Sequence, residues 1–143
     1  MYKIKYTYDF QPAFSDIDSY NCAHHSKFFV WFENARIAFL NEKLELSSDF
    51  ILKYKFPVVD LSCKFYRPII FGKQYSIEVL VEVDDEVPIL RFKYRITGYQ
   101  SRMLYAKGTT SHIISNDGKS ICEAIPEELL HRINKLEQTK IEE

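Results

Sequence analysis

The sequence has few of the residues that mark extracellular, fibrous or disordered proteins. Its 143 residues include only 3 Cys, 4 Gly and 5 Pro, which excludes a collagenous or low-complexity chain. Cys22, Cys63 and Cys122 are far apart and form no C-x-x-C pair. This spacing argues against a disulfide framework and against a cysteine-rich metal site. We therefore expect a protein of the reducing cytoplasm.

The chain also lacks an excess of either charge and any long apolar run. Its 19 Lys and Arg residues balance 20 Asp and Glu residues, whereas a general nucleic-acid binder is basic. No run approaches the roughly 18 apolar residues of a membrane span. The first ten residues, MYKIKYTYDF, alternate in polarity and do not form the apolar core of a signal peptide.

The sequence does have enough apolar residues to form one hydrophobic core. Apolar residues make up 46% of the chain and aromatic residues 15%, which fits one packed domain of this length. We expect a single domain over residues 1–143, with no membrane span and no nucleic-acid partner.

The order of the periodic segments predicts one helix among antiparallel strands. Strict alternation from Tyr2 to Phe10 indicates a half-buried strand. From His25 to Leu44 the apolar residues run too long for a strand, and they predict a helix buried on several sides. Four more strands, joined by tight turns, are expected at about 59–65, 75–83, 90–96 and 104–114.

The remaining segments are expected to be connections and a C-terminal helix. Residues 47–55 are predicted to be a polar link. Pro126 is typical of a helix start, and Leu129, Leu130, Ile133 and Leu136 then predict a short amphipathic helix. We expect the charged tail over 137–143 to be frayed.

Most of the candidate chemistry lies in residues 14–36, FSDIDSYNCAHHSKFFVWFENAR. Asp16 and Asp18 precede the predicted helix, and His24 and His25 fall at its start. A helix N-terminus offers unpaired N–H groups and partial positive charge that can hold an oxyanion. A nearby carboxylate can attack a carbonyl or activate water, so acyl transfer or hydrolysis is reasonable. Caps or Asx-turns are the commoner role of such aspartates.

Other polar residues of this region have simpler interpretations. Adjacent histidines do not face one side of a helix, so a metal site at His24 and His25 is not expected. Glu33 and Arg36, three apart, are expected to form a local ion pair. Arg91, Lys93 and Arg95 alternate along one strand, which is typical of a solvated sheet face and also suits the phosphates of coenzyme A.

Several short motifs together resemble the hotdog-fold thioesterases of the 4-hydroxybenzoyl-CoA thioesterase family, which includes the YbgC-like acyl-CoA thioesterases. The family pattern is D-x-D-x-x-G, a turn with His or Asn, an aromatic residue, and a helix reading aromatic-E-x-A-R. The matching residues are Asp16-Ile17-Asp18, Asn21, His25, Phe28 and Phe32-Glu33-Asn34-Ala35-Arg36. Later matches are Tyr66-Arg67-Pro68, Phe71-Gly72-Lys73, Tyr105-Ala106-Lys107-Gly108 and Ile125-Pro126.

The resemblance implies an α+β hotdog fold, in which a curved antiparallel sheet of about five strands wraps one long central helix. It also implies dimers or tetramers with the active site at a subunit interface. Asp18 would be the catalytic carboxylate, and the backbone N–H near His25 would polarise the thioester carbonyl. The His25 side chain would assist turnover, with Asn21 and Phe28 beside the substrate. Asn21 replaces the usual glycine and can adopt a positive φ.

The implied activity is hydrolysis of an acyl-CoA or acyl-carrier-protein thioester, without a cofactor. A non-catalytic hotdog protein that binds an acyl group or CoA is the first alternative. A hotdog dehydratase is the second, and it is disfavoured because no His-Phe-Pro motif occurs. Independently of the family, an open sheet edge that must be paired predicts a homo-oligomer.

Overall fold

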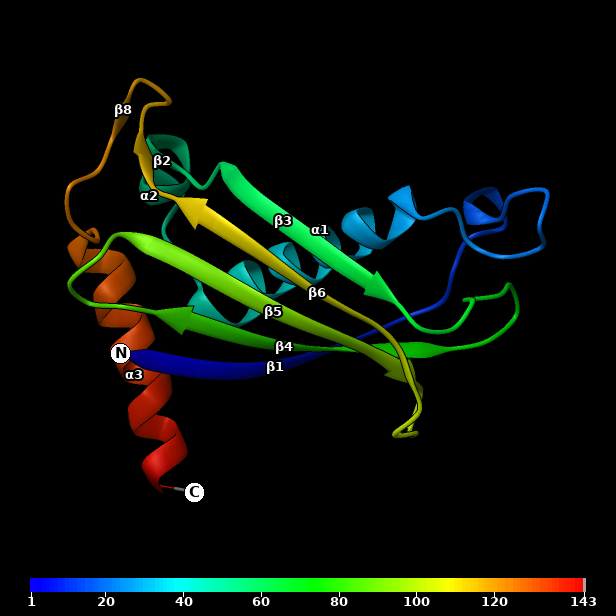
Figure 1. Cartoon of the computed structure of the whole chain (residues 1–143). Coiled ribbons are helices and arrows are strands. Elements are labelled where there is room, and N and C mark those ends of the chain that lie inside the picture. The colour runs from blue at the N-terminus through cyan, green and yellow to red at the C-terminus, as the bar shows by residue number, and fades with distance from the viewer. Residues whose placement is uncertain (143) are drawn as a thin grey trace.

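One curved antiparallel sheet forms the body of the molecule (Figure 1). The computed structural model describes residues 1–142, with the side chains of residues 1–137. All neighbouring strands of the sheet are antiparallel. Their order is β1 (Tyr2–Phe10), β4 (Tyr75–Val83), β5 (Ile89–Gly98), β6 (Leu104–Ile113) and β3 (Val58–Phe65). The predicted five-stranded antiparallel sheet is confirmed.

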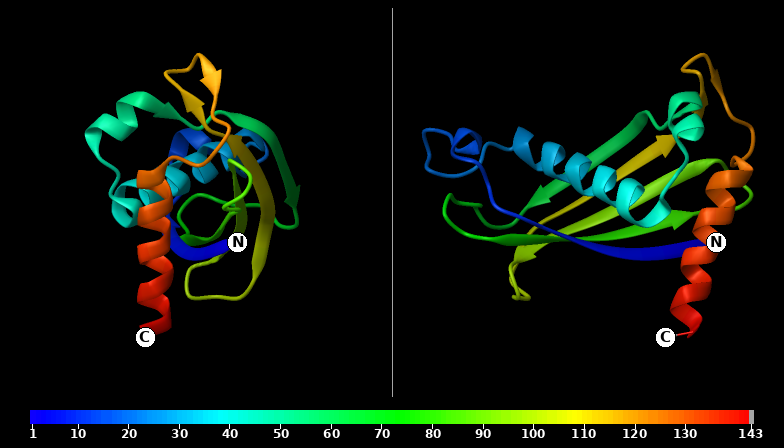
Figure 2. Two further views of the ribbon diagram at one scale, coloured as in Figure 1. Left: turned by 90° about the vertical axis from the view of Figure 1, so that its left-hand side faces the viewer. Right: turned by 180° about the vertical axis from the view of Figure 1, so that it is seen from behind.

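The central helix lies on the concave side of this sheet (Figure 2). Helix α1 (Ser26–Phe39) continues without a break into the π-helical turn η2 (Leu40–Leu44), so the helical run agrees with the predicted 25–44. The side chains that α1 buries recur every three or four residues, as expected for one face of a helix: Phe28, Trp31, Phe32, Ala35 and Phe39.

The prediction that this helix is buried on several sides is wrong for the single chain. Val30 and Ile37, seven residues apart on α1, are each 47% exposed. An apolar sequence does not say whether the cover comes from the same chain or from a second one. The chain buries one face of α1 and leaves apolar residues exposed on another.

A glycine allows the close contact between α1 and β6. A Cβ built on Gly108 would meet the Phe32 ring, with the ring Cζ at 2.7 Å. Phe32 is fully buried and stacks on Tyr94 of β5 with ring centroids 4.2 Å apart. The glycine of the Ala106-Lys107-Gly108 motif is therefore required so that an aromatic ring of the helix can rest directly on the strand.

The segment predicted to be a polar link contains regular structure. It forms α2 (Ser48–Lys53) and β2 (Tyr54–Lys55), and β2 joins β7 (Ser115–Asn116) and β8 (Ser120–Ile121) in a small second sheet. Ser47 caps α2 by accepting a hydrogen bond from the Phe50 N–H at 3.1 Å. Local capping and burial of Phe50 outweigh the polar composition of this segment.

The C-terminal helix is longer than predicted. Helix α3 (Glu127–Glu142) buries Leu129 and Ile133, and it includes residues expected to be frayed. The segment from 137 onward contains no Gly or Pro and is rich in residues that favour helices. Residue 143 lies outside the described residues. Within the described part of the chain, no helix is long and apolar enough to cross a membrane.

The two edge strands of the main sheet differ in how far other parts of the chain cover them. Strand β1 has α3 packed beside it, and the Lys3 N–H donates to Glu137 Oε1 at 2.7 Å. Strand β3 forms the other edge, and seven of its eight residues are exposed, with Cys63 intermediate. Its apolar side chains include Val59, Leu61 and Phe65, each about half exposed. The open edge is therefore β3.

Candidate functional site

The loop before α1 is a small hairpin that fixes the position of Asp18. Ile17 and Ala23 form an antiparallel bridge. The Asp18 N–H donates to the Cys22 carbonyl at 3.0 Å, and the Asn21 N–H donates to the Asp18 carbonyl at 3.1 Å. Asn21 has a φ of +62°, in the left-handed region that Asn tolerates. The expected positive φ at this position is confirmed.

Both aspartates of the motif bind turn amides. Asp16 Oδ2 accepts a hydrogen bond from the Ala13 N–H at 2.8 Å, and its Oδ1 lies 3.9 Å from Lys27 Nζ. Asp18 Oδ1 accepts from the Tyr20 N–H at 2.8 Å, which is an Asx-turn. Caps and Asx-turns are the commoner role of aspartates in such a position, and in the structure both side chains make contacts of this kind.

One N–H group at the start of α1 is free. The His24 N–H donates to the Asp16 carbonyl at 3.1 Å, and the Lys27 N–H donates to the His24 carbonyl at 3.0 Å. The Ser26 N–H donates to His24 Nδ1 at 3.3 Å. Among the described residues, the His25 N–H has no acceptor. This donor stands at the positive end of the helix dipole.

A cavity of about 310 Å³ opens beside this helix start. Its walls come from the hairpin loop, from α1 and from the end of β3 with the connection that follows it: Cys22, Ala23, His25, Phe28, Phe65, Tyr66, Arg67, Pro68 and Ile69. The Ala23 N–H donates to the Ile69 carbonyl at 2.8 Å and ties the two loops together. His25 and Phe28 thus meet in one cavity, whereas Asp18 and Asn21 do not line it.

The cavity is open toward the β3 edge. Phe65 and Tyr66 are 49% and 52% exposed, so two aromatic walls face solvent in the single chain. Arg67 brings a cation to the cavity. From the sequence, Arg67 is named only as part of the Tyr66-Arg67-Pro68 motif and is given no role at the site, so this motif was the available signal.

The thiol of Cys63 is not a nucleophile in this region. Burial raises the pKa of Cys63 to about 11, so the group is protonated at neutral pH. The reactive form of cysteine is the thiolate.

The predicted ion pair between Glu33 and Arg36 is absent from the described residues. The guanidinium of Arg36 instead donates to the Tyr94 hydroxyl at 3.2 Å. Tyr94, Thr110 and His112 continue a buried network that ends at the Phe56 carbonyl. Arg36 lies on the sheet side of α1, where a buried hydroxyl needs a partner, while Glu33 is exposed.

Comparison with known proteins finds a family match over part of the chain and a similar protein over most of it. Residues 20–83 match the model of the Thioesterase superfamily. A protein described as a putative esterase from Aquifex aeolicus is 24% identical over 126 residues, which cover 87% of this chain and 94% of that protein.

Two solved structures illustrate the likeness in fold. A hypothetical protein from Thermus thermophilus has a TM-score of 0.79 and 26% identity, covering 91% of this chain and 98% of that one. A 1,4-dihydroxy-2-naphthoyl-CoA thioesterase from Synechocystis has a TM-score of 0.80 and 20% identity, covering 93% and 98%. The predicted α+β fold, a five-stranded antiparallel sheet with a central helix, is the hotdog fold, and both of these structures share it.

Proposed function

We propose that this chain, with its hotdog fold and its match to the Thioesterase superfamily, hydrolyses acyl-CoA thioesters. The observation that carries the proposal is the free N–H of His25 at the start of α1, beside a cavity with apolar walls and one cation. A thioester carbonyl seated there would accept a hydrogen bond from this N–H. The helix dipole would add to the stabilisation of the oxyanion.

In the proposed reaction, Asp18 supplies the negative charge. Its carboxylate either attacks the thioester carbon directly or removes a proton from an attacking water. The tetrahedral intermediate collapses by breaking the carbon–sulfur bond, and the thiolate takes up a proton, for which the His25 ring in the cavity is the candidate donor. After direct attack, water then cleaves the acyl–Asp18 anhydride, which releases the acid and restores the Asp18 carboxylate. Water and thioester become a carboxylic acid and a free thiol. Asn21 shapes the turn beside Asp18, and Phe28 contacts the acyl group.

We further propose that the active unit is a homo-oligomer joined at β3. The half-exposed apolar residues of β3 and the exposed Val30 and Ile37 of α1 would be buried together by a second copy. The same contact would cover Phe65 and add a wall to the cavity that contains His25, and it would leave the Tyr66 side open toward the outer face of the sheet. We infer that a dimer is the minimal active form, that a tetramer is a pair of such dimers, and that the protein works in the cytoplasm.

The relatives guide the choice of substrates. One structural neighbour is named as a 1,4-dihydroxy-2-naphthoyl-CoA thioesterase and another as a gentisyl-CoA thioesterase. We therefore propose testing aromatic acyl-CoA esters, 4-hydroxybenzoyl-CoA among them, beside aliphatic esters of several lengths. Release of free thiol is the measurement. Thiol release from none of them, with measurable binding of acyl-CoA, would favour a non-catalytic acyl-binding protein.

The role of the His25 N–H can be isolated with two variants. The φ of His25 is −55°, which is close to the value that proline requires. His25→Pro removes both the N–H and the ring, whereas His25→Ala removes the ring alone. We expect His25→Pro to lower kcat about 10²-fold below His25→Ala, the scale of a lost oxyanion donor. Equal rates for the two folded variants would exclude this N–H from catalysis.

A further inference from the structure

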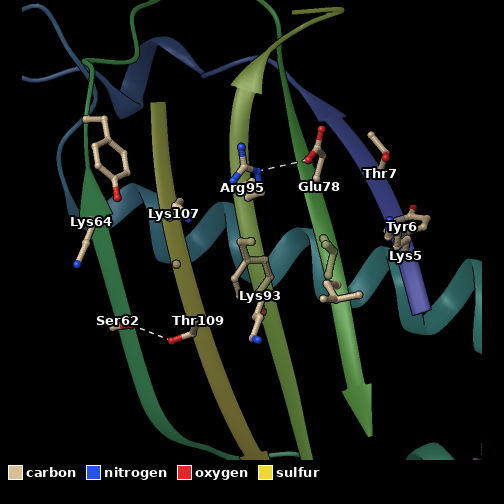
Figure 3. Close-up of a pocket in the computed structure, with 15 residues that line it drawn as sticks. Lys5, Tyr6, Thr7, Ser62, Lys64, Glu78, Lys93, Arg95, Lys107 and Thr109 are labelled. Carbon is tan, nitrogen blue, oxygen red and sulfur yellow. Dashed lines mark hydrogen bonds and ion pairs between the residues drawn. The ribbon is translucent and has the colours of Figure 1, made fainter. Parts of the chain in front are cut away.

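The face of the main sheet that points away from α1 has no cover in the described structure. In Figure 3 the helix passes behind the strands, and the side chains of this outer face stand in front of them. A groove of about 860 Å³ runs across all five strands. It contains none of the residues predicted for catalysis. The cations that line it are Lys5, Lys64, Lys93, Arg95 and Lys107.

Strand register places three of these cations side by side. Arg95 of β5 lies opposite Lys107 of β6, and Lys107 lies opposite Lys64 of β3. Like charges directly opposite each other destabilise a sheet. Arg95 Nε has a carboxylate neighbour, Glu78 Oε2 at 3.6 Å, but Lys107 and Lys64 form no ion pair with any described residue. Arg95, Lys107 and Lys64 thus form a row of like charges, which we call the lysine row. The row is unfavourable in the free chain and becomes favourable when an anionic partner binds to it.

The groove adjoins the proposed active site. Tyr66, at the end of β3, lines both the groove and the cavity that contains His25. An elongated acyl-bearing group can therefore pass from the outer face to the cavity around the end of β3.

The type of cation indicates the size of the partner. A small phosphate is usually held by arginine forks and free backbone N–H groups. Here four of the five cations are lysines, which act as flexible point charges, and the backbone N–H groups of the inner strands are used by the sheet ladder. The cations also extend from β1 to β3, about 19 Å at the usual strand spacing. A broad acidic protein surface fits this pattern better than a single phosphate.

A second copy of this chain does not fit with its two-fold axis at the row of Arg95, Lys107 and Lys64. A two-fold contact brings the same patch of both copies together, and the lysine row would then face lysines. We infer that the outer face docks an acidic carrier protein, which presents its acyl thioester on a prosthetic arm. This inference rests on the proposed thioesterase function and names the carrier protein as the source of the substrate.

The test compares one acyl group on two carriers. Lys107→Glu is the main variant, and Lys64→Glu is the second. Each places a carboxylate opposite at least one cation, so the fold should keep its stability. Lys119→Glu, an exposed site between β7 and β8, makes the same charge change elsewhere. We measure kcat/KM on an acyl-carrier protein and on the CoA ester of the same acid, and binding of the holo-carrier without turnover.

We expect Lys107→Glu and Lys64→Glu each to lower kcat/KM on the acyl-carrier protein about tenfold, with weaker holo-carrier binding. Rates on the CoA ester should change less than about threefold, and Lys119→Glu should match the parent. Raised salt should weaken carrier binding by the parent and have less effect on the variants.

Several results would overturn the inference. If Lys107→Glu and Lys64→Glu lost kcat/KM equally on both substrates, the lysine row would be assigned to binding of the CoA phosphates. If neither substrate showed a loss, the row would have no role in docking. Loss of binding to a nucleic-acid duplex in place of the carrier would identify a different partner. A parent that hydrolyses acyl-CoA but does not bind the carrier would contradict this inference alone. A parent that binds the carrier but hydrolyses neither substrate would contradict the proposed function and leave the docking surface standing.

Discussion

In the loop before α1, two aspartates with similar hydrogen bonds are proposed to have different roles. Asp18→Asn retains an oxygen that can accept the Tyr20 N–H, so the Asx-turn should persist. The change removes the negative charge needed for attack or base catalysis, and we expect kcat to fall about 10²-fold or more. Asp16→Asn keeps an acceptor for the Ala13 N–H and loses only the weak pairing with Lys27.

The measurement is kcat and melting temperature for both variants on one active thioester. Asp16→Asn should keep most of the activity, with a small loss of stability. The assignment of Asp18 fails if Asp18→Asn hydrolyses the thioester as fast as the parent.

At the scale of elements, the packing of α1 on β6 depends on one glycine. Gly108→Ala would place a methyl group against the Phe32 ring and the Ser62 carbonyl. We expect a loss of about 1–3 kcal/mol in the free energy of unfolding, the usual cost of overpacking. Lys107→Ala, on the exposed side of the same strand, should change stability by less than about 0.5 kcal/mol.

The contact between the Phe32 ring and position 108 can also be tested by replacing the ring with a shorter side chain. Phe32→Leu shortens the ring that blocks the methyl group, so Gly108→Ala should cost less in a Phe32→Leu background than in the parent. Urea titrations of the four proteins give the coupling energy. Strictly additive losses would mean that the ring is not what excludes the methyl group.

A buried histidine links β6 to the segment before β3. His112 contacts the Phe56 carbonyl and Thr110 Oγ1, each at 2.9 Å. Burial lowers the pKa of His112 below its usual value, and the nearby Arg36 charge acts in the same direction. Below about pH 6.5 the unfolded chain therefore binds more protons than the folded one. The contribution of His112 to stability is complete above that pH and is lost as the pH falls.

We expect the unfolding free energy of the parent to drop between about pH 7.5 and 5.5 by more than that of His112→Gln. One proton limits the difference to about 1.4 kcal/mol per pH unit. His131→Gln, on the exposed surface of α3, should follow the parent. Parallel pH curves for the parent and His112→Gln would contradict the proposed cause.

At the scale of the whole molecule, the open β3 edge predicts assembly. A half-exposed apolar edge strand beside an apolar helix face is a surface that a second copy can bury. We expect light scattering to give at least twice the chain mass of 17.0 kDa. Leu61→Lys should shift the protein to monomer and lower thioesterase activity, because the cavity near Phe65 would stay open.

Ile121→Lys is the matched control, since Ile121 is 64% exposed and lies on the small second sheet. This variant should keep both mass and activity. A parent that scatters as a monomer at micromolar concentration would exclude the β3 dimer.

The sequence by itself determined the elements that depend on local periodicity. Alternation from Tyr2 to Phe10 and the long apolar run after His25 were enough for β1 and for α1 with η2. The tight turn expected between the strands at 75–83 and 90–96 marked the hairpin between β4 and β5. The short motifs around Asp18 and His25 also located the loop and the helix start, because their chemistry follows from neighbours in the chain.

Only the tertiary structure decided features that depend on distant contacts. The partner of Arg36 is Tyr94, 58 residues away, and no helix spacing indicates that choice. The same holds for Arg67 in the cavity with His25, and for Lys64, Lys107 and Arg95 in one row. Strand register and the packing of α1 bring these residues together, and both result from the burial of apolar side chains across the whole chain.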